Sequence, residues 1–331
     1  MTYKCFELHT HTLNSDGDFT LAELRGQAGD FLYDAIAVTD HNTMSALDEL
    51  SSNPAEPGVP VIPGIEWTTY YGHMVVLGAD EYIDWRFARP ETIDEYTQAV
   101  KKVRGVVGIA HPFEFGSPLC TGCHWDFKVQ NWDAIDYIEV WSNPFPHSKL
   151  KNHLAFNWWT TLLNQGYHVA AAAGWDWHGP EKEAPLPPAT WLGLRDGRID
   201  TAGVRDALEG GRTLVTLGPF AELCLTGEDG HRYGLGETLR AGNYRLNLTV
   251  DENRRRKVWA SFGIATKTIR LVQGGSVIES LPYRPGHGLP AVDLTLRPGW
   301  LRMEGYGDHL GAEDTLLFFS SPIYIASPPS G

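Results

Sequence analysis

The sequence predicts an α/β barrel followed by a smaller β-rich unit. Residues 1 to about 215 alternate short apolar runs with amphipathic stretches. That alternation is typical of a mainly parallel sheet with helices on both faces. From about residue 219 the pattern changes to short β-type runs separated by Gly, Pro, Asn and Asp, which favours an antiparallel β-sandwich. We therefore expect a barrel over residues 1–218 and a β-rich accessory domain over residues 219–331.

In chain order, the apolar runs of the first part predict strands at residues 3–8, 35–39, 59–66, 73–78, 106–110, 134–141 and 168–174. Amphipathic stretches predict helices at residues 21–31, 43–50, 92–103, 149–165 and 201–209, and Gly210-Gly211 ends the last of these. About seven strands with helices between them favour a closed or nearly closed barrel.

The second part predicts strands at residues 222–226, 244–250, 257–262, 268–273, 292–296, 300–304 and 316–319. A basic run, Arg254-Arg255-Arg256-Lys257, is interpreted as a solvated hairpin tip. The run Cys120-Thr121-Gly122-Cys123-His124 matches a haem-attachment pattern. We interpret that match as coincidence, because no export signal is visible and no further ligands lie nearby.

Composition excludes several classes of protein. The 331 residues carry 27 Lys and Arg against 41 Asp and Glu, a net charge of −14, which disfavours an extended nucleic-acid groove. We see no apolar run of ~18 residues and no signal-peptide pattern, so we expect no membrane span and a cytoplasmic location. The 4 cysteines do not make a disulfide scaffold. Nothing in the sequence indicates the oligomeric state.

Histidines and carboxylates gather at the predicted strand ends. In a strand, residues i and i+2 point to one face, so His9 and His11 point the same way. His178 follows Asp176 with the same spacing, and Asp16 lies in a turn after the first strand. Active sites of such barrels lie at the carboxyl ends of the strands. The full candidate set is His9, His11, Asp16, His41, Glu66, His73, His111, Asp176 and His178.

These residues predict a metal site, because packing them together without cations is electrostatically costly. Imidazole and carboxylate ligands without thiolate suit Mn, Fe or Zn, and the set is large enough for two or three divalent ions. A water bridging two such ions loses its proton near neutral pH and becomes a nucleophile. Asp40 is expected either to orient a ligand imidazole or to cap the following helix.

The motifs His9-Thr10-His11, Ser15-Asp16-Gly17, Thr39-Asp40-His41-Asn42, Gly64-Ile65-Glu66, Gly72-His73, Ala110-His111-Pro112 and Asp176-Trp177-His178 resemble, in order, those of the PHP (polymerase and histidinol phosphatase) family. The resemblance covers about residues 3–218 and implies a distorted (β/α)7 barrel, a di- or trinuclear metal site and hydrolysis of phosphate esters. Near residues 211–219, the sequence further resembles the branch that includes carbaryl hydrolase.

The resemblance also implies how the ligands divide. His9, His11, Glu66 and Asp176 would hold the first ion, Asp16, His41 and His178 the second, and Glu66, His73 and His111 the third. Among these, the catalytic residues would be Glu66, Asp176, His178 and His41. His73 is the ligand that depends most on the alignment of the fourth strand.

Substrate recognition leaves a weaker trace in the sequence. Asn143 resembles a family position near the metals, and Trp67 and Trp141 are predicted as pocket walls that suit a flat or apolar leaving group. Phosphate needs cationic or N–H partners. The candidates after the sixth strand are His147, which we favour, and Lys149, Lys151, His153 and Arg195.

We therefore expect a metal-dependent phosphoesterase that acts on a small phosphomonoester or phosphodiester. One alternative is a carbamate or carboxylate ester hydrolase that uses the same metals. Another is a non-catalytic binding module whose metals are only structural. Structural sites are closed, whereas ligands from six strand ends that face a barrel mouth favour catalysis.

Overall fold

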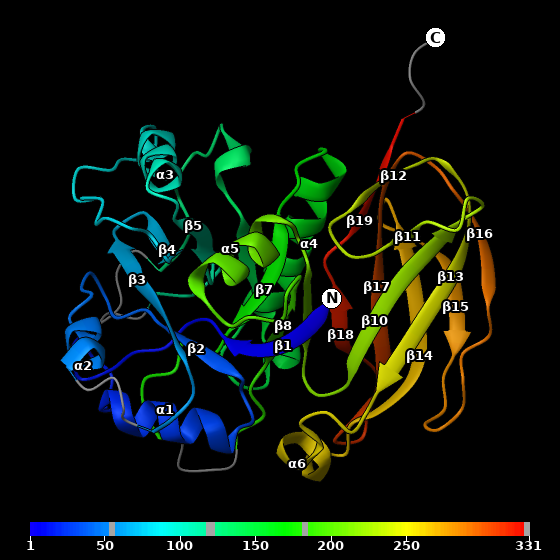
Figure 1. Cartoon of the computed structure of the whole chain (residues 1–331), viewed down its shortest axis with the longest axis horizontal. Coiled ribbons are helices and arrows are strands. Elements are labelled where there is room, and N and C mark those ends of the chain that lie inside the picture. Colours follow the sequence, from blue (N-terminus) through cyan, green and yellow to red (C-terminus); the bar gives the residue numbers. More distant parts are fainter. Residues whose placement is uncertain (53–56, 117–122, 181–184, 328–331) are drawn as a thin grey trace.

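The computed structural model describes residues 1–52, 57–116, 123–180 and 185–327. The chain forms an α/β barrel and, beside it, a unit made almost entirely of strands (Figure 1). Cys120 lies outside the described residues. Within the described residues, no helix combines the length and the apolar character needed to cross a bilayer.

Seven strands follow one another around the barrel in chain order. They are β1 (Thr2–Glu7), β2 (Ala35–Val38), β3 (Val61–Thr69), β4 (Gly72–Leu77), β5 (Val106–Ala110), β6 (Tyr137–Ser142) and β7 (Ala170–Gly174). All seven lie where the sequence predicts strands. The neighbours are parallel except at β4, which pairs antiparallel with both β3 and β5. Because β4 is reversed, its first residues lie level with the last residues of the strands beside it.

Two further strands that the sequence reading missed complete the barrel. They are β8 (Ala189–Leu194), antiparallel to β1, and β9 (Thr213–Thr216), antiparallel to β8. Side-chain hydroxyls join β7 to them: Thr190 Oγ1 bonds to both the N–H and the C=O of Ala173, and Thr213 Oγ1 donates to the carbonyl of Ala171. The α/β barrel is thus confirmed, and these hydroxyl groups close its last seam together with one short backbone bridge between Thr10 and Trp177.

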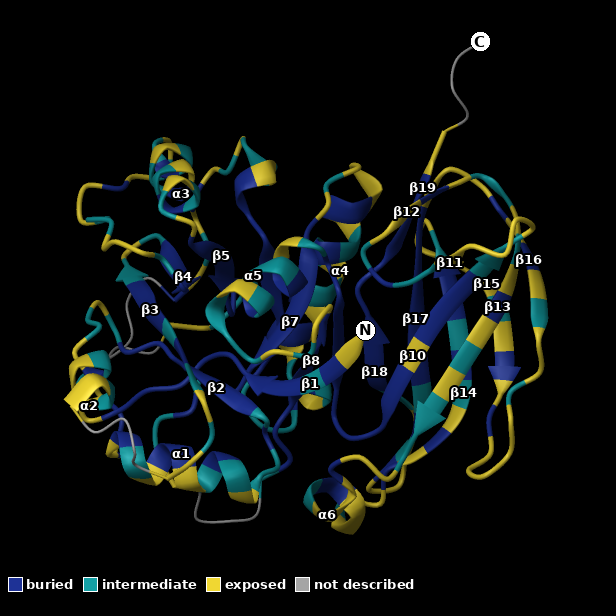
Figure 2. Cartoon of the chain, in the orientation of Figure 1, coloured by how far each residue is buried: buried dark blue, intermediate teal, exposed yellow. Residues whose placement is uncertain are grey.

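Helices cover the outside of the barrel, and their outer faces are exposed (Figure 2). A capping box, in which Thr20 and Glu23 satisfy each other's backbone N–H groups, begins the first helix. Asp200 caps the last by accepting from the N–H of Gly203. These five helices, all predicted, are α1 (Leu21–Asp30), α2 (Ala46–Ser52), α3 (Ile93–Lys102), α4 (Leu150–Asn164) and α5 (Thr201–Glu209).

The β-rich part contains a four-stranded antiparallel sheet and a second set of strands opposite it. The first sheet has the order β11 (Arg232–Tyr233), β10 (Phe220–Gly227), β13 (Gly242–Asp251) and β16 (Val292–Leu296). The second set comprises β12 (Thr238–Arg240), β14 (Ala265–Gln273), β15 (Ser276–Pro282), β17 (Gly299–His309), β18 (Ala312–Ser320) and β19 (Ile323–Ala326). Since β18 pairs antiparallel with β9, this second set is continuous with the barrel sheet.

The prediction for residues 254–262 is wrong in two respects. Residues 257–262 form no strand; the chain there makes the short helix α6 (Arg256–Trp259) and the 3-10 turn η3 (Ala260–Phe262). The basic run is not a hairpin tip either, although Arg254, Arg256 and Lys257 are exposed as expected. Arg255 is buried, donates from Nε to the carbonyl of Phe31 and lies 4.4 Å from the ring centroid of Tyr33. It therefore fastens the β-rich part to the barrel, a long-range contact that local sequence pattern does not report.

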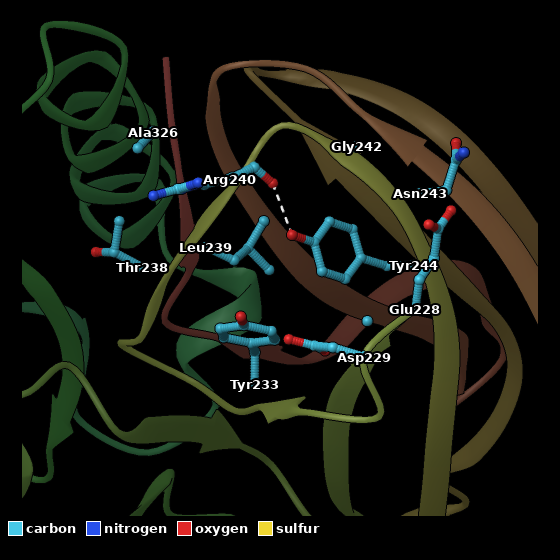
Figure 3. Close-up of a pocket in the computed structure, with 11 residues that line it drawn as sticks. Glu228, Asp229, Tyr233, Thr238, Leu239, Arg240, Gly242, Asn243, Tyr244 and Ala326 are labelled. Carbon is cyan, nitrogen blue, oxygen red and sulfur yellow. Dashed lines mark hydrogen bonds between the residues drawn. The ribbon is translucent and has the colours of Figure 1, made fainter. Parts of the chain in front are cut away.

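A large cavity, of about 830 Å³, lies in the β-rich part (Figure 3). It opens between β11 and β12, which are edge strands of their sheets. Tyr233 and Tyr244 line it with rings 86° apart, and Tyr244 Oη donates to the carbonyl of Arg240. None of the predicted metal ligands lines this cavity, so size alone does not locate the candidate catalytic site.

Candidate metal centre

The nine predicted ligands come together at one end of the barrel. Their nitrogen and oxygen atoms form three groups, each within a 4.8 Å span. The groups are His9, His11, Glu66 and Asp176; His11, Asp16, His41 and His178; and Glu66, His73 and His111. Glu66 and His11 each belong to two groups, which makes the cluster continuous.

The first group is built on the His-x-His segment after β1. His9 Nε2 lies 3.2 Å from Glu66 Oε2 and 3.4 Å from Asp176 Oδ1. His11 Nε2 lies 3.1 Å from the same Asp176 oxygen. All four members are at most one-fifth exposed at their side chains. Two imidazoles and two carboxylates thus converge on one buried point.

The second group lies nearer the surface. Asp16 Oδ1 is 3.2 Å from His178 Nε2, 3.5 Å from His41 Nε2 and 3.9 Å from His11 Nδ1. A neutral imidazole has only one nitrogen lone pair. His11, whose two nitrogens face different groups, can therefore serve one ion at a time as a neutral ligand. The Asp16 side chain is 59% exposed, so this group faces solvent.

The third group depends on the reversed strand β4. His73 is the second residue of β4 and pairs across the ladders with Thr68 on one side and Ala110 on the other. Its Nδ1 therefore lies 3.0 Å from Glu66 Oε1, and His111 Nε2 lies 3.2 Å from the same oxygen. The antiparallel turn between β3 and β4 thus brings the ligand with the weakest sequence support into the cluster.

The electrostatics of the cluster call for cations. Burial raises the pKa of Glu66, but the charge of His9 and hydrogen bonds from His111, His41 and His73 outweigh it and hold the pKa well below its ordinary value. Burial lowers the pKa of His9, yet Glu139, Glu66 and Asp176 raise it well above its ordinary value. Glu66 is therefore anionic and, with its neighbouring carboxylates, favours positive charge at His9.

Buried atoms without hydrogen bonds support the same conclusion. His9 Nε2, Glu66 Oε2 and His73 Nε2 are among the buried side-chain atoms that make no hydrogen bond in the described structure. Buried polar atoms are normally satisfied, so each of these requires an explanation. Divalent metal ions fit this donor set, because imidazole nitrogens and carboxylate oxygens are the ligands that Mn, Fe and Zn accept.

The backbone at the strand ends is strained where the ligands are presented. Asn42, His111, Asn143 and Asp176 adopt left-handed conformations with φ of 57°, 23°, 60° and 59°. Such conformations are costly for residues other than glycine and concentrate at functional sites. Each of these residues is a candidate site residue or the neighbour of one.

Two buried carboxylates beneath the ligands were not assigned from the sequence. Glu139 Oε1 accepts from His9 Nδ1 at 2.8 Å, and its Oε2 accepts from the N–H of His111 at 3.1 Å. Glu7 accepts from the N–H groups of His9 and Trp175, and burial raises its pKa to about 8. Glu7 and Glu139 each lie in a strand whose other residues are mostly apolar. An acidic residue in such a strand is the signal in the sequence that could have identified both.

Gly174, at the end of β7, leaves room for the carboxylate of Glu139 because it has no side chain. A Cβ at this residue would lie 2.5 Å from Glu139 Oε1 and 2.6 Å from His9 Cβ, closer than non-bonded atoms approach. The absence of a side chain there leaves room for the contact between Glu139 and His9. Asp176 and His178 follow two and four residues later on the same chain segment.

Asp40 does neither of the two things expected of it. Its carboxylate accepts from the N–H of Thr12 at 2.7 Å, from Thr12 Oγ1 at 2.8 Å and from Ser15 Oγ at 2.7 Å. It therefore holds the turn that carries Asp16, rather than an imidazole or a helix end. Its influence on the site is exerted through the position of Asp16.

We expect Glu139→Gln to weaken metal binding about 10- to 100-fold, as loss of a hydrogen-bonding partner behind a histidine ligand commonly does. The amide keeps the shape but removes the charge that favours the proton on His9 Nδ1, and with it the lone pair on Nε2. The measurement is competition between the protein and a chromophoric chelator. Glu95→Gln, an exposed substitution in α3, is the control. Equal affinities for both variants would contradict this role for Glu139.

The predicted substrate-binding residues are placed very differently from one another. Trp67 and Trp141 are only 1% and 2% exposed and belong to the hydrophobic core. They do not line the mouth of the barrel, because their strands turn these side chains away from the ligand face. His147 packs against His309 of β17, with ring centroids 4.3 Å apart. Burial lowers the pKa of His147 to about 4, so it is neutral near pH 7 and carries no charge for phosphate.

Asn143 lies beside the cluster, together with a lysine. Its side-chain amide donates to the carbonyl of Trp175 at 3.0 Å, and its Oδ1 accepts from Lys151 Nζ. Lys151 also pairs with Glu114. Burial lowers the pKa of Lys151 to about 8, and the charge of Asp176 opposes this shift. Among the five cationic candidates, Lys151 is thus placed near a metal ligand.

Histidines and carboxylates that cluster at one end of the strands are typical of a metal-binding α/β barrel. Comparison with known families makes this specific, because residues 7–112 match the model described as the PHP domain. Residues 7–112 are thus similar to the PHP domain. The match includes seven of the nine candidate ligands, all but Asp176 and His178.

Relatives and solved structures agree with this placement. The chain is 33% identical over 78 residues to the 3',5'-nucleoside bisphosphate phosphatase of Chromobacterium violaceum, covering 22% of this chain and 27% of that protein. It is 29% identical over 124 residues to an uncharacterised protein of Methanocaldococcus jannaschii, covering 38% of this chain and 66% of that one. The chain therefore spans less than two thirds of either relative.

A structure from Bacteroides vulgatus resembles the whole chain. It is a two-domain protein containing a predicted PHP-like metal-dependent phosphoesterase, and it matches with a TM-score of 0.54 at 15% sequence identity. The match covers 97% of this chain and 95% of that one. The likeness supports the fold, including the β-rich part, and leaves the chemistry to be argued from the site.

Proposed function

We propose that this protein hydrolyses small phosphate esters with two or three divalent metal ions held at the end of the barrel. The observation that carries the proposal is the continuous cluster of nine histidine and carboxylate side chains. Its solvent-facing side, where Asp16 is 59% exposed, leaves space for substrate. A purely structural metal site would be closed on all sides.

The proposed division of ligands follows the three groups. The first ion would be held by His9, His11, Glu66 and Asp176, the second by Asp16, His41 and His178, and the third by Glu66, His73 and His111. Mn, Fe and Zn suit these ligands, since no thiolate lies among them. Glu66 bridges the first and third groups, because its two oxygens face different sets of imidazoles.

When bound, adjacent divalent ions lower the pKa of a water between them and neutralise phosphoryl oxygens. The protein contributes the rest. Lys151 lies beside Asn143 and near Asp176, where its ammonium group is placed to bind a phosphoryl oxygen. Asp40 fixes the turn of Asp16, and Glu139 fixes the ring of His9. These contacts hold the ligand geometry before substrate arrives.

A small substrate is proposed because the cluster lies at a barrel mouth and the protein carries a net charge of −14. The C. violaceum relative, whose name describes a phosphatase of 3',5'-nucleoside bisphosphates, supports a phosphomonoester of modest size. Phosphodiesters remain within the same chemistry, since both substrates present phosphoryl oxygens to the ions.

The test measures p-nitrophenol release by Mn-loaded protein from a matched phosphomonoester, phosphodiester and carboxylate ester. Phosphoester turnover that a chelator abolishes is the expected result. Asp176→Asn is expected to remove it, while Asp48→Asn, on the exposed face of α2, leaves it within about twofold. Turnover of the carboxylate ester alone would replace the proposal with an ester hydrolase. Full activity in Asp176→Asn with an intact fold by circular dichroism would reject the site.

A further inference from the structure

A second cavity, of about 290 Å³, lies beside the metal cluster. Its walls come from the turn between β3 and β4 and from the loop that follows β4. The residues that matter here are Thr68, Tyr70, Tyr71, Trp85, Arg86 and Arg89. None of them was predicted as a site residue, because they lie in loops whose apposition is set by the hairpin.

Thr68 connects this cavity to the cluster. Its Oγ1 lies 2.5 Å from His41 Nδ1, and it pairs across the hairpin with His73. Side chains alternate along a strand, so Thr68 and Glu66 point to the same side of β3. One residue therefore forms both the wall of the cavity and the edge of the metal centre. The cavity therefore begins one side chain away from the ligand His41.

The chemistry of the lining is specific. Tyr70, which lines the cavity, is 77% exposed, so its ring is open to contact with a ligand. The Trp85 Nε1–H is buried and makes no hydrogen bond among the described residues. An indole N–H is a donor only, so it calls for an acceptor from outside the chain. Aromatic faces together with an unused donor suit a planar ring that bears hydrogen-bond acceptors.

Two guanidinium groups lie on the same wall, although the protein as a whole is acidic. Arg86 pairs with Asp84 through Nη2 at 2.6 Å. Arg89 forms no ion pair within the described part of the chain, and its one side-chain hydrogen bond goes from Nη1 to the carbonyl of Ala88. An arginine presents five donors in a planar fork that matches phosphate and carboxylate. Arg89 is thus free to bind an anion.

We propose that this cavity binds the leaving-group side of the substrate, and that the preferred substrate is a phosphate ester with a planar heteroaromatic group and a second anionic group. The ring would stack in the cavity and accept from the Trp85 indole N–H, and Arg89 would bind the second anion. This inference rests on the proposed phosphoesterase function, which brings the scissile phosphate to the cluster next to Thr68. It adds the substrate class and the residues that select it.

The test compares kcat/KM for adenosine 3',5'-bisphosphate, adenosine 5'-monophosphate and p-nitrophenyl phosphate with Mn-loaded protein. The wild type is expected to prefer the bisphosphate. Arg89→Gln is expected to lower kcat/KM for the bisphosphate about 10- to 100-fold, the usual effect of losing hydrogen bonds to a charged group. The variant should change p-nitrophenyl phosphate turnover by less than about threefold, because that substrate carries no second anion.

Two further measurements separate the possible outcomes. Trp85→Phe keeps an aromatic ring without the N–H and should weaken both adenosine substrates about equally. Arg198→Gln, an exposed arginine paired with Asp200, is the matched control and should change nothing. Titration calorimetry of adenosine 5'-monophosphate into metal-free protein measures the subsite without catalysis, and Trp85→Phe should weaken that binding.

Failure of this inference differs from failure of the proposed function. Turnover of p-nitrophenyl phosphate without preference for the bisphosphate, or equal losses on all substrates in Arg89→Gln, would overturn the subsite while leaving the phosphoesterase intact. No phosphoester turnover at all, with metal bound, would overturn the proposed function. Calorimetric binding that Trp85→Phe weakens would then still support the cavity as a nucleotide-binding site.

Discussion

Glu66→Gln is expected to lower phosphoester turnover by about 10³-fold or more. Glu66 is fully buried, and its two oxygens face five imidazoles, those of His9, His11, His41, His73 and His111. A neutral amide offers one oxygen and no charge to the groups that share it. A bound ion supplies several kcal/mol of transition-state stabilisation, and about 4 kcal/mol corresponds to about 10³ in rate.

Metal content per chain and steady-state turnover together check this prediction. The variant should bind at least one ion fewer than wild type after equal loading and gel filtration. Glu95→Gln, which removes an exposed carboxylate from α3, controls for the change in net charge. A Glu66→Gln protein with a full complement of metal and turnover within tenfold of wild type would show that Glu66 does not bridge the ions.

Phe319→Ala is expected to lower the free energy of unfolding by about 3–5 kcal/mol, the range for removing a buried phenylalanine ring. Phe319 of β18 is completely buried, and its ring centroid lies 4.9 Å from that of Trp141 and 5.1 Å from that of Phe156. It joins the β-rich part to β6 and α4 of the barrel. Domains have total stabilities of only about 5–15 kcal/mol, so the loss is a large fraction.

Urea unfolding followed by tryptophan fluorescence and by circular dichroism measures this loss. Because Phe319 packs on both parts, the two probes should report coincident transitions at a lower midpoint. Val277→Ala, at a 55% exposed position in β15, should change stability by no more than about 0.5 kcal/mol. Two separate transitions, with only the β-rich part destabilised, would show that the parts unfold independently.

The metal centre could be predicted from the sequence because its determinants are local. The spacing of His9 and His11, and of Asp176 and His178, places side chains on one face of an extended chain whatever surrounds it. The carboxyl ends of parallel strands meet at one end of a barrel, so motifs far apart in sequence converge. Even His73 follows from this logic once β4 is recognised as antiparallel, since its start then lies at that same end.

The residues around the substrate could not be predicted in the same way. Trp67 follows the ligand Glu66, so strand alternation points it into the core. Trp141 comes two residues after Glu139, and an irregularity in the strand register between the two accompanies its burial in the core. Lys151 was one of five cationic candidates, and only the packing of α4 distinguishes it from the others. Trp85 and Arg89, the proposed cavity residues, lie in a loop whose placement depends on packing. Likewise, the β-propensity of residues 257–262 was outweighed by the docking of Arg255 on Phe31 and Tyr33.

The pairing of β9 with β18 has a consequence for how the protein is made. Ser321 lies just beyond β18. Its hydroxyl forms a hydrogen bond with the hydroxyl of Thr213 and accepts from the N–H of Ala171 in the barrel seam. The ribosome reaches this segment about 100 residues after β9, which at about 5–20 residues per second is a delay of roughly 5–20 s. Until then the nascent barrel has an unpaired edge strand, the kind of surface on which chains aggregate. We therefore expect the growing chain to need chaperones most during that interval of its synthesis.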